Sequence, residues 1–224
     1  MRLTALLSAL LLLVPGLCSG AEKAAFVARL AAGQPQTVVT YGTSLTAGGA
    51  WVAQFGAALE KNFPKLATVV NSAKGAMWSK WGVENLDGRV IAKKPDALFI
   101  EFSINDAFLE YKTPVEDARK NLETMIDRTL AAQPACEIIL LVMNPPTGAH
   151  LDRRPKIAGY EQVYRDVAKA RGLRLIDFSA DWQAVLQQGE AQWHALVPDG
   201  IHPNADGARQ VILPHLLKSL GLAP

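Results

Sequence analysis

The feature that most constrains the fold is a series of five short, mostly apolar segments separated by stretches with helical periodicity. We expect these segments to be β-strands, at residues Thr37–Tyr41, Ala67–Val70, Asp96–Phe102, Glu137–Met143 and Leu173–Asp177. Strands that are apolar on both faces are typical of parallel sheets with helices packed on each side. Because crossovers between parallel strands are right-handed, the pattern predicts an α/β fold, a three-layer α/β/α sandwich around a five-stranded parallel sheet.

Helical stretches alternate with these strands along the chain. We expect helices at Ala24–Ala32, Ala50–Phe63, Ser79–Lys93, Thr113–Ala132, Ile157–Arg171, Ala180–Gln188 and Ala205–Leu220. The third is expected to break near Asp87-Gly88. In the fourth, Thr113 is expected to cap the helix, with Pro114 at its first position and Glu116 completing a capping box.

The N-terminus has the pattern of a secretory signal peptide. Met1-Arg2 gives a positive start, residues 3–14 are almost entirely apolar, and Pro15-Gly16 ends the run. Such a run is too short to span a bilayer comfortably, and small residues follow it. We therefore expect cleavage after Gly20 or Ala21.

Cys18 leaves a lipoprotein as the alternative, but the bulky Leu17 before it disfavours lipidation. No later segment is long enough for a membrane helix, and none has the composition of a linker. The interpretation is therefore a signal peptide at residues 1–20 and one domain at residues 21–224, exported to the periplasm or outside the cell.

Composition and missing motifs argue against several classes of function. Lys and Arg number 23 against 21 Asp and Glu, so the net charge of +2 gives no basic footprint for nucleic acid. Basic pairs such as Lys93-Lys94 and Arg153-Arg154 are interpreted as solvated faces. Cys136 is expected to be a buried thiol. The chain lacks His-Glu-x-x-His, Cys-x-x-Cys, a glycine-rich dinucleotide loop and a mid-chain Gly-x-Ser-x-Gly, so no metal or cofactor is expected, nor an α/β-hydrolase.

Small polar residues follow three of the predicted strands. Ser44, in Tyr41-Gly42-Thr43-Ser44-Leu45-Thr46, comes directly after the first strand, while Gly75 and Asn105 come after the second and third. Ligands of open parallel sheets bind outside the carboxyl ends of the strands, so we expect these residues to meet at one rim. Serine also suits turns and helix caps, so Ser44 alone is not specific.

The late segment Asp199-Gly200-Ile201-His202-Pro203 supplies what a reactive serine needs. A serine needs a base to take its proton, and the imidazole needs an acceptor on its other nitrogen. Ser44, His202 and Asp199 can fill these roles, and Gly75 and Asn105 can offer donors to an oxyanion. The alternative is that the segment is only a turn before a helix, with His202 packed.

Together, four blocks resemble those of the SGNH hydrolases, also called GDSL-type esterases and lipases, over essentially the whole mature chain. The blocks are Gly42-Thr43-Ser44-Leu45-Thr46, Asn71-Ser72-Ala73-Lys74-Gly75, Ser103-Ile104-Asn105-Asp106 and Asp199-Gly200-Ile201-His202-Pro203. The resemblance implies the flavodoxin-like SGNH hydrolase fold and an esterase without a cofactor. It implies Ser44 as nucleophile, His202 as base, Asp199 as its partner, and an oxyanion hole from Ser44, Gly75 and Asn105.

Two residues depart from the family pattern. Thr43 stands where the serine block usually has Asp, and Ser103 stands where the asparagine block usually begins with Gly. Neither is an expected triad member or oxyanion donor. We expect their effect in the supporting geometry, and hence in the rate or the substrate range.

The substrate is expected to be a small-molecule or polysaccharide ester with a short acyl group, such as acetyl on carbohydrate. Trp78 and Trp81 follow Gly75 directly, and tryptophan near a rim suits stacking on a sugar ring. The alternatives are that both are core aromatics, that the enzyme is a lipase, lysophospholipase or thioesterase of the same family, or that it is an inactive carbohydrate-binding protein on this scaffold.

Overall fold

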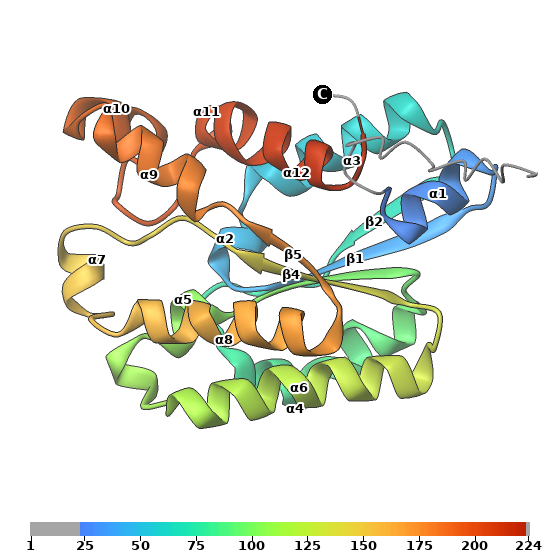
Figure 1. Ribbon diagram of the computed structural model, residues 1–224, viewed down its shortest axis with the longest axis horizontal. Coiled ribbons are helices and arrows are strands. Elements are labelled where there is room, and N and C mark those ends of the chain that lie inside the picture. The colour runs from blue at the N-terminus through green and yellow to red at the C-terminus, as the bar shows by residue number, and fades with distance from the viewer. Residues whose placement is uncertain (1–22, 223–224) are drawn as a thin grey trace, which may run out of the picture.

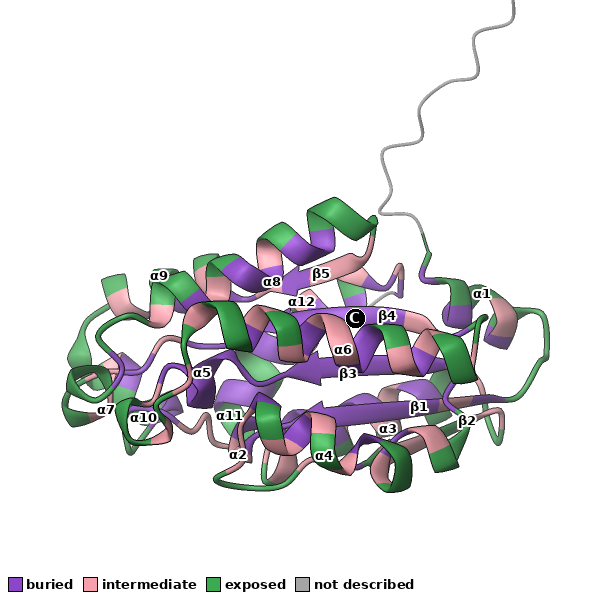
Figure 2. Cartoon of the chain, turned by 90° about the horizontal axis from the view of Figure 1, so that it is seen from below, coloured by how far each residue is buried: buried purple, intermediate pink, exposed green. Residues whose placement is uncertain are grey.

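One five-stranded, all-parallel sheet forms the centre of the computed structural model, which describes residues 23–222. Its strands lie in the order β2-β1-β3-β4-β5, which can be followed in Figure 2. Their bounds are β1 Gln36–Gly42, β2 Ala67–Asn71, β3 Ala97–Glu101, β4 Glu137–Val142 and β5 Arg174–Asp177. All five predicted strands are present, and the predicted α/β sandwich is confirmed.

Alternate residues of each central strand feed two separate cores. In β3, Phe99 belongs to one buried cluster, while Leu98 and Ile100 belong to the other, as the period of two in a strand requires. The first cluster is covered by α1 (Ala25–Ala31), α3 (Ala50–Asn62) and the C-terminal helices, the second by α4 (Ser79–Arg89), α6 (Val115–Ala132) and α8 (Ile157–Arg171). Figure 2 shows β1, β3 and β4 buried, with exposed positions on the outer faces of the helices.

The break predicted near Asp87-Gly88 lies at Val90. α4 runs from Ser79 to Arg89, and a separate 3-10 turn follows at Ile91–Lys93. Arg128 of α6 holds this end in place, because it donates to the Val83 carbonyl and to the Asp87 carboxylate.

The predicted capping box at Thr113 is absent. Pro114, with extended backbone (ψ 152°), is itself the cap residue, and α6 begins at Val115 with no side-chain cap. The Thr113 carbonyl instead accepts a hydrogen bond from the Tyr160 hydroxyl (2.7 Å). The Thr113 hydroxyl donates to the Tyr111 carbonyl (3.5 Å) and does not cap α6.

The C-terminal layer is more divided than predicted. It consists of α9 (Ser179–Gln187), α10 (Glu190–Leu196), α11 (Ala205–Gly207), a π-helical turn at Ala208–Ile212 and α12 (Leu213–Ser219). The wide turn comes just before Pro214, which has no N–H to continue a regular helix. Helix α10 was not predicted; its Trp193 packs edge-on against the buried Trp182 of α9.

The carboxyl ends of the strands lie at one rim, beside three short helices. These are α2 (Ser44–Ala47) after β1, α5 (Ser103–Asp106) after β3, and α7 (Ala149–Asp152) beyond β4 (Figure 1). No helix between residues 23 and 222 is long and apolar enough to cross a membrane. The predicted signal peptide and Cys18 lie outside the described residues.

Candidate active site

Ser44 is placed at the rim by the turn that joins β1 to α2. Thr43 caps this short helix, because its hydroxyl accepts a hydrogen bond from the Leu45 N–H (3.2 Å). Ser44 is the first residue of the helix, and its Oγ lies 2.8 Å from Nε2 of His202. Two residues 158 positions apart in sequence therefore meet at hydrogen-bond distance.

His202 is oriented by Asp199. The imidazole Nδ1 lies 2.6 Å from Asp199 Oδ2, and the backbone N–H groups of Ile201 and His202 donate to Asp199 Oδ1 (3.0 and 2.8 Å). Burial opposes ionisation of this carboxyl, but the His202 and Ile201 donors outweigh it and lower its pKa to about 2. Asp199 is thus an anion at neutral pH and favours a proton on Nδ1, which leaves Nε2 to accept one from Ser44.

The loop that carries Asp199 and His202 is fastened to the end of β4. Asn144 donates its side-chain N–H to the Ile201 carbonyl (2.8 Å), and the Thr147 N–H donates to the Gly200 carbonyl (2.9 Å). Gly200 takes a left-handed conformation (φ 84°) that suits glycine. The support that Asn144 and Thr147 give to this loop was not predicted from the sequence.

The three predicted oxyanion donors each have an N–H group without an acceptor among residues 23–222. The Ser44 and Gly75 backbone N–H groups have no acceptor among residues 23–222. A Cβ built on Gly75 would lie 3.8 Å from the Ser44 Cβ, so the two backbones face the same space. Asn105 is 6% exposed and gives one side-chain N–H to the Met77 carbonyl (2.9 Å), leaving its other N–H available. The structure thus brings Ser44, Gly75, Asp199 and His202 together, and Asn105 is linked through Met77 to the segment that carries Gly75. Their roles in catalysis stay predictions.

Comparison with known proteins gives the family. The model of the GDSL-like lipase/acylhydrolase family matches residues 30–210. The chain belongs to this family. The predicted resemblance is confirmed, and the chain is a hydrolase that acts on ester bonds. Curated protein sequences give no match.

Solved structures share the fold at low sequence identity. A GDSL-like lipase from Parabacteroides merdae has a TM-score of 0.75 at 18% identity, covering 84% of this chain and 96% of that one. A catalytic mutant of Axe2, an acetylxylan esterase from Geobacillus stearothermophilus, has a TM-score of 0.72 at 21% identity, covering 84% and 95%. LAE5, an α/β hydrolase enzyme from the metagenome of Lake Arreo, has a TM-score of 0.72 at 24% identity, covering 85% of this chain and 97% of that one.

The Thr43 departure from the family pattern is explained by a buried glutamate. Glu101, the last residue of β3, is 1% exposed; its carboxylate accepts hydrogen bonds from the Thr43 N–H (3.0 Å), the Thr43 hydroxyl (2.9 Å) and the Thr46 hydroxyl (3.0 Å). Burial raises the pKa of Glu101 to about 7, although these hydrogen bonds oppose the shift. The signal that could have revealed Glu101 is a single charge within an apolar strand.

Asp106 is a second buried carboxyl of this GDSL-like chain. It accepts the Ser79 N–H (2.9 Å) and so ties α5 to the start of α4. Burial raises its pKa to about 7, against the effect of the Ser79 hydrogen bonds. Ser103, the other departure, is buried at the start of α5 and lines no part of the cavity beside Ser44.

A cavity of about 390 Å³ opens beside the Ser44 hydroxyl. Its walls are mostly small residues: Ser44, Leu45, Ala47, Gly48, Gly49, Gly75, His202 and Pro203. Neither predicted substrate-binding tryptophan lines it. Trp81 packs against the buried Tyr41 (ring centroids 5.7 Å) under Arg89, and Trp78 stacks on Tyr111 (4.5 Å). A substrate role for either residue stays a prediction.

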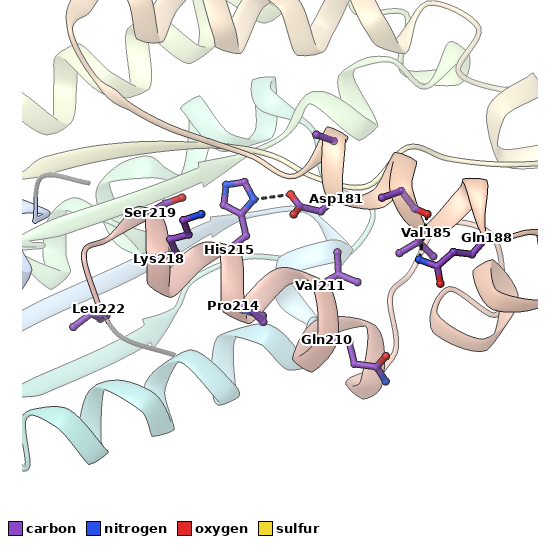
Figure 3. Close-up of a pocket in the computed structure, with 12 residues that line it drawn as sticks. Asp181, Val185, Gln188, Gln210, Val211, Pro214, His215, Lys218, Ser219 and Leu222 are labelled. Carbon is purple, nitrogen blue, oxygen red and sulfur yellow. Dashed lines mark hydrogen bonds and ion pairs between the residues drawn. The ribbon is translucent and has the colours of Figure 1, made fainter. Parts of the chain in front are cut away.

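A larger cavity of about 750 Å³ lies between α9 and α12 (Figure 3). None of Ser44, Asp199 and His202 lines it. Its polar lining includes His215 and Asp181, which share a hydrogen bond (Nδ1–Oδ2 2.5 Å), and the His215 ring lies against Phe178. These contacts hold the two helices together. No cluster of His, Cys, Asp and Glu suited to a metal occurs among residues 23–222.

One basic pair does not lie where it was predicted. Arg153 is exposed and forms an ion pair with Glu110, as a solvated face requires. Arg154, in contrast, is 6% exposed and donates to the Asn105 side chain. The interpretation of Arg154 as a solvated residue is therefore wrong.

Proposed function

We propose that this family member is an exported serine esterase that cleaves carboxylic esters through an acyl-enzyme. The observation that carries the proposal is the continuous hydrogen-bond chain from Ser44 through His202 to Asp199. It lies beside a cavity and next to two backbone N–H groups that have no acceptor among residues 23–222. A nucleophile, a base in contact with it and an orienting acid form the arrangement that activates a serine.

The proposed reaction has two halves. Ser44 Oγ attacks the ester carbonyl carbon while His202 Nε2 takes its proton, and the carbonyl oxygen becomes an oxyanion held by the N–H groups of Ser44, Gly75 and Asn105. His202 then gives the proton to the leaving alcohol, and the ester bond breaks. Water, deprotonated by the same imidazole, releases the acid and restores Ser44.

The cavity favours short acyl groups. Its 390 Å³ lie near the lower end of the range of ligand pockets, about 300–1,000 Å³, and its walls carry glycine and alanine. An acetyl group on carbohydrate is the proposed substrate type, and the shared fold with an acetylxylan esterase supports it. Export is proposed from the leader at residues 1–20.

The test compares the purified mature protein with Ser44→Ala on 4-nitrophenyl acetate, butyrate and octanoate, and then on acetylated xylo-oligosaccharides. We expect acetate to be the best aryl ester and Ser44→Ala to lose at least about 10³-fold in kcat. Equal rates for the two proteins would overturn the serine mechanism. A preference for octanoate would favour a lipase, and binding of the oligosaccharide without hydrolysis would favour an inactive carbohydrate-binding protein.

A further inference from the structure

A buried arginine stands behind the oxyanion donor Asn105. Arg154, in the segment between α7 and α8, is the one buried Lys or Arg among residues 23–222. The structure gives it no carboxylate partner within those residues. A buried charge without a counter-ion is costly unless hydrogen bonds compensate it, so its position calls for a reason.

Its hydrogen bonds all go to neutral oxygens, two on α5 and one on α7. The guanidinium donates from Nε to the Ile104 carbonyl (2.8 Å), from Nη1 to the His150 carbonyl (3.2 Å) and from Nη2 to Asn105 Oδ1 (3.3 Å). Its other contact is the ring of Phe108, whose centroid lies 4.6 Å from the guanidinium carbon. The planar guanidinium thus donates both to the backbone of Ile104 and to the side chain of the next residue, Asn105.

The hydrogen bond from Arg154 determines the orientation of the Asn105 amide. A guanidinium can only donate, so the amide oxygen must face Arg154 and the amide nitrogen must face the opposite side. On that side Nδ2 already donates to the Met77 carbonyl (2.9 Å), next to the segment that carries Gly75. The second N–H of the amide then remains for a ligand beside Ser44.

We propose that Arg154 is a positioning residue that fixes and polarises the Asn105 amide as a donor to the oxyanion. The inference rests on the proposed function. Its positive charge pulls electron density toward Oδ1, which strengthens the N–H donor at the other end, and hydrogen bonds in a chain reinforce one another in this way. The effect is greatest when negative charge develops on the substrate oxygen, so Arg154 acts on the transition state more than on bound substrate.

Arg153 provides a matched control. It is the next residue in the chain, and its guanidinium carbon also lies 4.6 Å from the Phe108 ring centroid. It differs in facing solvent, with 52% of its side chain exposed, and in pairing with Glu110. Arg153→Met therefore removes the same charge and the same ring contact without touching Asn105.

The experiment is a double-mutant cycle on 4-nitrophenyl acetate. We expect Arg154→Met to lower kcat about tenfold at a nearly unchanged KM, and Asn105→Ala to lower it about 10²-fold or more. In the Asn105→Ala background, Arg154→Met should have little further effect, because its action runs through the missing amide. Arg153→Met should stay within about twofold of the native chain.

A second readout separates positioning from folding. A trifluoromethyl ketone forms a tetrahedral oxyanion on the serine, so Arg154→Met should weaken its binding by the same factor as kcat. If Arg154→Met does not fold, Arg154→Lys takes its place: the lysine keeps the charge but cannot reach both Ile104 and Asn105, and its kcat loss should likewise vanish without Asn105.

The inference is overturned if the Arg154 effect persists in full in the Asn105→Ala background, or if Arg153→Met loses as much as Arg154→Met. Native kcat in every Arg154 variant would overturn it as well. The proposed function fails by a different result, full activity of Ser44→Ala, so the two failures are distinguishable.

Discussion

At the scale of single residues, Thr43 shows how a departure from a family pattern is accommodated. An Asp at this position would place a carboxylate against that of Glu101, in a site where both are screened from water. A threonine hydroxyl can instead donate to the carboxylate and accept from the Leu45 N–H. Thr43 and Glu101 are therefore a matched pair, and the identity of one constrains the other.

Thr43→Asp tests this pairing. We expect it to lower the free energy of unfolding by about 3 kcal/mol or more, because an uncompensated buried charge has a cost of that order. Thr43→Asp combined with Glu101→Gln should regain most of the loss, since the Gln amide can donate to the new carboxylate. Urea unfolding and the 4-nitrophenyl acetate rate report the two effects. The pairing is wrong if the double variant is no more stable than Thr43→Asp.

Glu101 and Arg154 also mark the limit of sequence analysis at this scale. The residues whose type states their chemistry, Ser44, His202 and Asp199, could be placed by motif and spacing. A buried charge is different, because its role depends on which distant backbone and side-chain groups surround it. Arg154 looks like any basic residue beside Arg153 until the contact with Asn105 is known.

At the scale of elements, the site depends on loops held by neighbouring elements. The strands were predictable because both of their faces are apolar. The start of α6 was not, because the Tyr160 hydroxyl of another helix donates to the Thr113 carbonyl, which in the predicted cap would accept the first hydrogen bond within α6. Helix α10 was not predicted either. Its Trp193 donates to the Thr147 hydroxyl (2.9 Å), and that hydroxyl donates to the Gly200 carbonyl (3.2 Å) in the loop of Asp199 and His202.

Gly200→Ala tests the importance of that loop. Its positive φ costs an alanine about 1–2 kcal/mol, and the added Cβ would lie 3.0 Å from the Thr147 hydroxyl and 3.3 Å from its carbonyl oxygen. The loop must shift, so we expect kcat to fall about 10–100-fold, because catalysis is sensitive to displacements near 1 Å.

Gly172→Ala is the control for backbone strain. Gly172 ends α8 with φ 62°, and no atom of residues 23–222 lies within 4 Å of an added Cβ, so this variant should lose similar stability and keep its kcat. Steady-state kinetics with thermal unfolding of both variants gives the comparison. An unchanged kcat in Gly200→Ala would show that the loop tolerates displacement.

At the scale of the whole molecule, the parallel sheet explains why distant blocks form one site. β1 and β3 are neighbours in the sheet, and Gly42 lies beside Glu101 in register, so the turn with Ser44 and the turn with Asn105 leave the same rim. The order of the strands places these turns at the centre of the sheet. This convergence was predictable from the sequence, whereas the two buried carboxyls beneath the rim were not.

Those carboxyls give the protein a pH-dependent stability. Glu101 has a pKa of about 7 in the folded chain against 4.5 when free, because burial disfavours its anion. The folded state thus binds this proton more tightly than the unfolded chain does. The resulting contribution to the free energy of unfolding is present in full below pH 4.5 and is lost as the pH rises through 7. Asp106, raised from 3.8 to about 7, acts in the same direction.

Glu101→Gln isolates the contribution of Glu101, because the amide resembles the protonated carboxyl and can keep the bonds to Thr43 and Thr46. We expect the free energy of unfolding of the native chain, relative to this variant, to fall by about 3 kcal/mol between pH 4.5 and 7.5. Urea unfolding at half-unit pH intervals measures it, and the variant should keep the part of the slope that Asp106 causes. Parallel stability curves for the two proteins would mean that Glu101 is ionised in the folded state throughout this range, and that its hydrogen bonds outweigh its burial.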